Sequence, residues 1–194
     1  MSEILTDATV RTYTVDPSHS RLGFVVRHLG FSKVRGAFEQ FEGTVRMTPG
    51  DLSTLAAEAT IQASSISTNE EKRDAHLRSA DFFEVETYPT ITFRSTEVRD
   101  VKGDRFTLVG DLTMHGVTKR IALEGEFLGE GPDPWGGTRV AFEAGTKVNR
   151  KDFGLNWNVA LEAGGWLVSE DVEIVLEVQA VLQKEQALQK EQAV

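Results

Sequence analysis

The sequence contains no cysteine, no long apolar run and no recognisable targeting segment. Without cysteine, neither disulfides nor thiolate metal sites can stabilise the fold, and thiol catalysis is excluded. No window approaches the ~20 consecutive apolar residues that a membrane-spanning helix needs, so we expect no stable membrane insertion. Residues 1–10 carry neither a basic start nor an apolar stretch, which predicts a cytoplasmic protein without a secretion signal.

Positive charge is also in short supply. The chain has 21 Lys and Arg against 30 Asp and Glu, a formal net charge of -9, which opposes binding to a phosphate backbone and predicts no nucleic-acid partner. The phosphate-binding motif Gly-x-x-x-x-Gly-Lys is absent, and the four histidines (His19, His28, His76 and His115) lack the spacing of metal ligands on a helix. We therefore expect neither a cofactor nor a metal.

The dominant pattern is alternation of apolar and polar residues. Leu22, Phe24 and Val26 share one face of a strand, and Arg21 and Arg27 share the other. Similar segments lie near residues 11–15, 34–47, 57–63, 90–99, 106–114, 119–128, 138–148 and 171–181. Many short strands at close spacing, several interrupted by glycine, predict an all-β fold: a single extended antiparallel β-barrel of about eight strands.

The barrel is expected to occupy residues 11–181 as one domain. Residues 1–10 are predicted to be a flexible N-terminal segment. Residues 182–194 repeat the sequence LQKEQA, and the six-residue period puts Leu182 and Leu188 on different helical faces, which favours a polar helical or frayed tail.

Small residues on one predicted face leave the interior undecided. Ala57, Ala59 and Ala63 alternate with polar residues, and small inward side chains would leave space that a filled core would occupy. Alternatively, a covering helix packs there. Both interpretations remain open at this point.

One helix and two loops complete the prediction. Thr68-Asn-Glu-Glu71 matches a capping box and leads into a short helix over residues 72–80, which we place near one barrel mouth. Residues 129–137 are expected to form a long exposed loop or turn. The polar and aromatic residues 149–158 are candidates for closing the second mouth. Phe82, Phe83 and Trp157 or Trp166 are interpreted as core residues.

The predicted helix carries the densest set of functional groups. In an acid–base interpretation, His76 acts as a base that Asp74 orients. In a structural interpretation, which we favour, these groups serve helix capping and ion pairs. In a third, Arg73 and His76 receive the polar head of a ligand, since a guanidinium can bind a carboxylate or phosphate through two parallel bonds.

Ten motifs in one order resemble the YceI-like family over residues 13–181. They are Asp16-Pro-Ser-His-Ser20 before Phe24, His28-Leu-Gly30, Arg35-Gly-x-Phe38, Phe41-x-Gly43, Ser65-Ile-Ser-Thr68, Arg73-Asp-x-His-Leu77, Asp81-Phe-Phe83, Tyr88-Pro-x-Ile-x-Phe93, Gly110-Asp-Leu-Thr-Met-His-Gly-Val-Thr-Lys119 and Arg150-x-Asp-Phe-Gly154. The resemblance implies a lipocalin-like barrel, usually a homodimer, that binds, stores or transports an isoprenoid lipid such as a polyprenyl phosphate or an isoprenoid quinone in an apolar tunnel.

Inward periodicity selects the candidate ligand-binding residues. They are Leu22, Phe24, Val26, Phe38, Phe41, Ile61, Leu77, Phe93, Leu112, Met114 and Phe142 for the wall, with Arg73, His76 and Arg150 for the head group. No catalytic residue is assigned. Two alternatives remain: a lipid-modifying enzyme that uses Asp74 and His76, and a stress-related interaction module whose core is filled by side chains.

Overall fold

The computed structural model describes residues 9–162 and 164–183. Its elements in chain order are β1 (Arg11–Val15), η1 (Pro17–His19), β2 (Arg21–His28), β3 (Ser32–Phe38), β4 (Phe41–Thr48), β5 (Asp51–Gln62), η2 (Ala63–Ser65), β6 (Ile66–Ser67), α1 (Glu71–Arg78), β7 (Thr90–Lys102), β8 (Arg105–Met114), β9 (Val117–Pro132), β10 (Thr138–Asn149), η3 (Arg150–Phe153) and β11 (Val168–Leu182). The predictions for residues 1–8 and 184–194 lie outside the described residues.

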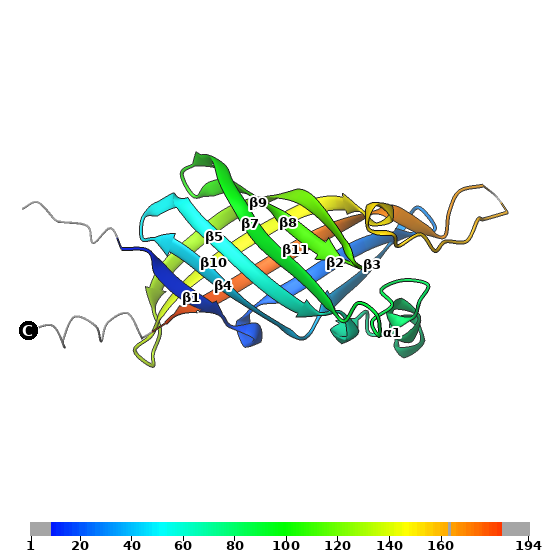
Figure 1. Ribbon diagram of the computed structural model, residues 1–194, viewed down its shortest axis with the longest axis horizontal. Helices are drawn as coiled ribbons and strands as arrows, with labels where there is room; N and C mark the ends of the chain where they lie inside the picture. The colour runs from blue at the N-terminus through cyan, green and yellow to red at the C-terminus, as the bar shows by residue number, and fades with distance from the viewer. Residues whose placement is uncertain (1–8, 163, 184–194) are drawn as a thin grey trace, which may run out of the picture.

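Eight strands form a closed antiparallel barrel, as the alternation predicted (Figure 1). Their order is β1-β4-β5-β7-β8-β9-β10-β11, and β1 closes the sheet by pairing with β11, where Tyr13 faces Leu182. The other half of the same β11 edge pairs with β2, which continues the sheet through β3 and the short β6. The β2–β3 hairpin therefore lengthens the wall at one end of the barrel.

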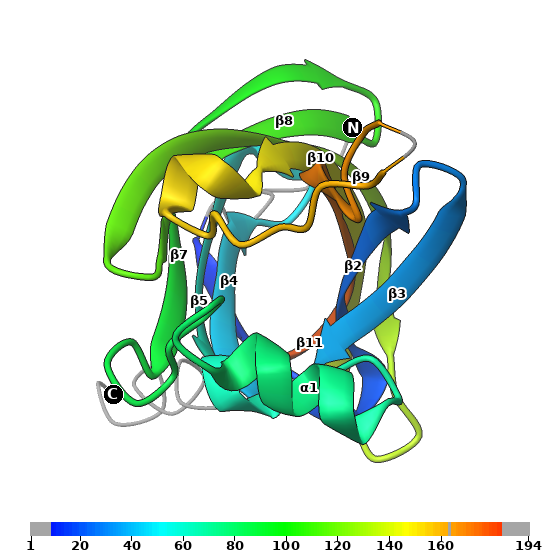
Figure 2. The ribbon, with the colours of Figure 1, turned by 90° about the vertical axis from the view of Figure 1, so that its right-hand side faces the viewer.

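The two ends of the barrel differ. A packed apolar cluster around Tyr13, Met47 and Val140, all buried, fills the end where β1 lies. At the other end, α1 lies on one side of the opening, and η3 with the segment that follows it lies on the opposite side (Figure 2). The barrel is thus filled by packed core side chains at one end, and at the other end its opening is flanked by α1 and η3.

Three of the predicted segments are wrong in their extent. The strand expected over residues 57–63 begins earlier, since β5 runs from Asp51 to Gln62 and Ala63 lies in η2. The strand expected over residues 34–47 is two strands, because the chain bends at Glu39 and Gln40, whose backbone N–H groups donate to the carbonyl and hydroxyl oxygens of Ser65. The loop expected over residues 129–137 is shorter, since β9 continues to Pro132 beside β10. Only the turn remains, and Asp133 Oδ1 holds it by accepting hydrogen bonds from the N–H groups of Trp135 and Gly137.

The helix prediction is right in position and wrong in its cap. Glu70, and not Thr68, is the N-cap, because its carboxylate accepts hydrogen bonds from the N–H groups of Lys72 and Arg73. Thr68 is used elsewhere, since both its N–H and its hydroxyl donate to Asp74 Oδ1. Over the described stretches of chain, none of the helices has the length and apolar character that crossing a membrane requires.

Candidate ligand cavity

The barrel encloses a cavity of about 580 Å³. This volume lies within the roughly 300–1,000 Å³ of small-molecule sites. Its wall is overwhelmingly apolar. Thr68, Lys72, Arg73, His76 and Arg150 line it at the end framed by α1 and η3, and Glu42, Thr44 and Glu58 line it along β4 and β5. An interior filled by side chains, the second of the two alternatives, does not agree with this cavity.

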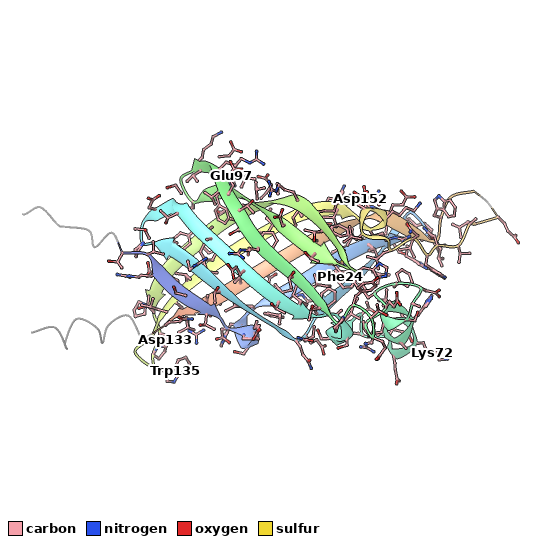
Figure 3. All side chains as sticks on the ribbon, in the orientation of Figure 1. Phe24, Lys72, Glu97, Asp133, Trp135 and Asp152 are labelled. Carbon is pink, nitrogen blue, oxygen red and sulfur yellow. The ribbon has the colours of Figure 1, made fainter. Side chains whose placement is uncertain are left out.

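The predicted inward face is the face that lines the cavity. The wall residues Leu22, Phe24 and Val26 of β2, Phe38 of β3, Phe41 of β4, Ile61 of β5, Phe93 of β7, Leu112 and Met114 of β8, Phe142 of β10 and Leu77 of α1 all line it, as do Arg73, His76 and Arg150. Figure 3 labels Phe24 on β2 and Lys72 on α1. The structure brings all these residues to one cavity, and their contact with a ligand stays a prediction.

Small residues keep the interior open. Of the three alanines, Ala57 and Ala59 line the cavity, and Ala63 is buried where β5 ends. Glycines also let aromatic rings lie flat against the wall. A Cβ added to Gly36 would sit 2.3 Å from Phe24 Cζ, and one added to Gly110 would sit 2.4 Å from Phe93 Cζ. Because each ring occupies the place of a missing side chain, less of it projects into the cavity.

The aromatic residues at the open end belong both to the core and to the lining: Phe82 is a buried core residue with Phe83 and Trp157 packed against it, as the sequence predicted. Phe82, Phe83 and Trp157 all line the cavity. The His76 ring contacts Trp157 with centroids 4.7 Å apart and Phe82 with centroids 5.2 Å apart. Alternation could not find them, because they lie outside the strands; the Asp81-Phe-Phe83 motif was the available signal. Trp166 instead is exposed.

The predicted acid–base pair is not assembled. The Asp74 carboxylate accepts both hydrogen bonds from Thr68, and it is buried. His76 Nε2 instead lies 2.7 Å from Asp81 Oδ2, in the turn that follows α1. The carboxylate therefore anchors α1 to the preceding loop and does not orient the imidazole. The enzyme alternative loses the geometry on which it rested.

Arg73 is fixed at the edge of the cavity. Its Nε donates to Thr68 Oγ1 at 2.7 Å, and its Nη2 donates to the Thr68 carbonyl oxygen at 3.1 Å. The residue is exposed. Its guanidinium therefore serves first to hold α1 against the strand end, and it remains accessible at the opening.

Arg150 is the most deeply buried cation of the site. Only 5% of it is exposed, and its Nε and Nη1 donate to the carbonyl oxygens of Ser169 and Leu155. Its guanidinium carbon lies 6.0 Å from the centroid of the Phe82 ring. Burial lowers the pKa of Arg150, and the charge of Glu170 opposes this effect. Among the described residues, none provides an acceptor for the buried Nη2.

A buried hydrogen-bond donor without an acceptor is costly, so Arg150 Nη2 calls for an acceptor from outside the described residues.

The position of Arg150 also corrects the prediction for residues 149–158. They do not close a second mouth, because η3 and Trp157 lie at the same end as α1, in contact with Phe82 and His76. All three candidate head-group residues therefore lie at one end of the cavity.

The model of the YceI-like domain matches residues 13–180 of this chain. The chain belongs to the YceI-like family. It is 39% identical over 173 residues to the protein YceI of Salmonella arizonae, an alignment that covers 88% of this chain and 87% of the relative. The resemblance inferred from the ordered motifs is thus confirmed.

Two solved structures have the same fold. BcnA of Burkholderia cenocepacia matches with a TM-score of 0.74 and 22% identity, covering 86% of this chain and 99% of that one. A polyisoprenoid binding domain from Saccharophagus degradans, implicated in plant cell wall breakdown, matches with a TM-score of 0.64 and 17% identity, covering 88% of this chain and 98% of that one. At these identities the likeness concerns the fold.

Proposed function

We propose that this YceI-like protein binds a long amphiphilic isoprenoid lipid, such as a polyprenyl phosphate or an isoprenoid quinone, and stores or transports it inside the barrel. The observation that carries the proposal is an apolar cavity lined at one end by Arg73, His76 and Arg150, where the buried Arg150 Nη2 has no acceptor among the described residues. The name of the Saccharophagus degradans domain supports the choice of an isoprenoid.

The tail supplies the affinity. Each buried CH₂ group contributes about 0.8 kcal/mol, and a cavity of about 580 Å³ accommodates a chain of several such groups. Association costs about 4–15 kcal/mol in lost freedom, so the tail must bury many carbons before binding becomes tight. The wall of Leu, Val, Ile and Phe side chains suits an extended polyprenyl chain, because it offers a large apolar contact area with few polar groups to desolvate.

The head group supplies the orientation. An oxygen of the lipid, from a phosphate or a quinone carbonyl, would accept a hydrogen bond from the Arg150 guanidinium beside the Phe82 ring. His76 and Arg73, nearer the surface, would meet the outer part of the same head. This arrangement places the tail toward the packed end of the barrel and the head toward α1.

Native mass spectrometry of the purified chain tests the proposal. We expect a bound mass that corresponds to an isoprenoid lipid, or uptake of an isoprenoid quinone or prenyl phosphate when it is offered. A mass equal to the bare chain, with no uptake of either lipid, would contradict it. Ala59→Phe should abolish uptake by filling the cavity, whereas Ala56→Phe, on the opposite face of β5, should leave it unchanged.

We also infer that the cavity binds its lipid without catalysis, since the Asp74 carboxylate is held by Thr68. Turnover of a bound lipid that disappears in His76→Ala while binding survives would contradict this inference. Transport of the lipid, a homodimer and a cytoplasmic location stay predictions from the sequence. Sedimentation equilibrium and cell fractionation test the last two.

A further inference from the structure

Large apolar side chains are exposed around the open end of the barrel. Phe31 is 76% exposed at the tip of the β2–β3 hairpin, and Trp166 is 54% exposed in the loop before β11. Leu29 and Val159, also exposed, lie in the same two loops. We call these four residues the mouth rim. In Figure 1 the loop between η3 and β11 projects beyond the barrel at the end where α1 lies.

Backbone hydrogen bonds join the two loops into one surface. The Leu29 N–H donates to the Leu167 carbonyl at 2.9 Å, and the Leu167 N–H donates to the Val159 carbonyl at 2.9 Å. Ala160 and Trp166 form a β-bridge. Leu167 also lines the cavity, as does His28 in the hairpin. The rim therefore lies directly outside the cavity's polar end and shares residues with its wall.

Positive charge is concentrated on the β2–β3 hairpin side of this rim although the whole chain is acidic, whereas the loop that carries Trp166 also carries Glu162. Residues 17–38 contain four Lys and Arg and no Asp or Glu, in a chain of net charge -9. Arg27, Lys33 and Arg35 of the β2–β3 hairpin are exposed, and in the described chain none of the three makes an ion pair. Nearby, the Lys151 ammonium, which is paired with Glu170, lies 5.7 Å from the centroid of the Trp166 ring. Exposed aromatics beside unpaired cations are the combination that suits an anionic lipid surface.

We propose that the mouth rim docks this protein on an anionic lipid bilayer, with Phe31 and Trp166 inserted at the headgroup level and Arg27, Lys33 and Arg35 against the lipid phosphates. The inference rests on the proposed function, because a lipid bound in the cavity has to be exchanged with a lipid phase. A second copy of the chain fits the surface less well, since a two-fold contact would bring the same unpaired cations face to face.

Vesicle co-sedimentation of the full chain tests this docking. The probes are phosphatidylcholine vesicles with and without phosphatidylglycerol. We expect binding only to the vesicles that contain phosphatidylglycerol, loss of binding in Phe31→Ser/Trp166→Ser, and loss in Lys33→Glu/Arg35→Glu. Because each cation near the surface contributes about a fivefold factor, the single variant Lys33→Gln should weaken binding about fivefold, and high salt should weaken it further.

Matched control variants change an exposed aromatic residue and two exposed cations that lie away from the mouth rim. Trp135, 77% exposed in the β9–β10 turn, is an equally exposed aromatic far from the rim (Figure 3), so Trp135→Ser should bind vesicles as the wild type does. Arg99→Glu/Lys102→Glu reverses two exposed charges on β7 and should also leave binding unchanged apart from a general charge effect of less than twofold.

Uptake of a detergent-solubilised prenyl phosphate, followed by native mass spectrometry, separates the two proposals. Rim variants that take up the lipid normally but no longer bind vesicles support the docking surface. A wild type that takes up the lipid but ignores phosphatidylglycerol vesicles overturns the docking and leaves the proposed function intact. Equal vesicle binding by wild type and Phe31→Ser/Trp166→Ser overturns it as well, as does binding to a second copy or to an acidic protein in place of the vesicles.

Discussion

Arg150 is the residue whose substitution discriminates most sharply between a head-group site and a structural contact. Arg150→Met removes the guanidinium and keeps an unbranched chain of comparable length. The carbonyl oxygens of Ser169 and Leu155 each lose a donor, and the Phe82 ring loses its cation. At the same time the cost of burying a cation disappears, which offsets part of the lost stability.

The effect on binding should depend on the ligand. If Nη2 donates a charge-assisted hydrogen bond to a lipid phosphate, its loss costs about 1.5–3 kcal/mol, which raises Kd about 10- to 150-fold. A hydrocarbon with the same polyprenyl tail and no head group makes no such bond. Its Kd should change less than about twofold, because the apolar wall of β2, β7 and β8 remains in place.

Competition against a fluorescent fatty probe measures both affinities in the wild type and in Arg150→Met. The preference for the prenyl phosphate over the matched hydrocarbon should collapse in the variant. Arg150→Lys should retain part of the preference, since it keeps the charge and loses the planar fork. An equal rise in Kd for both ligands would refute the reasoning, because it would mean that Arg150 only supports the shape of the cavity. Thermal melts of each variant show whether the fold is retained.

Two predictions concern the barrel itself. Gly110→Ala places a Cβ 2.6 Å from the Arg94 carbonyl oxygen and against the Phe93 ring, so it should lower the free energy of unfolding by about 1–3 kcal/mol. Gly131→Ala, which has open space around the added Cβ, should not lower it. Equal melting temperatures of the Gly110→Ala and Gly131→Ala variants would contradict the packing argument. Burial and a hydrogen bond to Glu130 raise the pKa of Tyr13 to about 12. The stabilisation that the protonated Tyr13 hydroxyl contributes to the folded state is complete below about pH 10, the pKa of tyrosine in the unfolded chain. It is lost as the pH rises through about 12. Urea titrations across this pH range give the free energy of unfolding of the wild type and of Tyr13→Phe, and the two values should converge as the pH rises. A constant difference between them would show that the ionisation of Tyr13 does not contribute.

Alternation was enough to predict the barrel and its inner face. Leu22, Phe24 and Val26 line the cavity as expected, because successive side chains of a strand point to opposite sides whatever the strand pairs with. The same local rule fails where the chain bends. Phe38 and Phe41 lie on two strands, since Ser65, distant in the sequence, holds the bend between them.

Polar groups near one another in the sequence were harder to pair. Asp74 and His76 are two residues apart, and they point to different partners, Thr68 and Asp81. The N-cap is Glu70 and not the predicted Thr68 for the same reason, because the Thr68 hydroxyl is engaged by the buried Asp74. A short polar side chain has several partners within reach, and packing decides among them.

The sequence by itself determined the strands, the face that each presents to the interior, and the family, because these depend on local periodicity and on motifs read in order. Only the tertiary structure decided that the interior is open and that Arg73, His76 and Arg150 meet at one end. Those facts depend on the closure of β1 on β11 and on the place of η3 across the opening from α1, and such contacts join residues more than a hundred positions apart or on separate elements. A period of two carries no information about them.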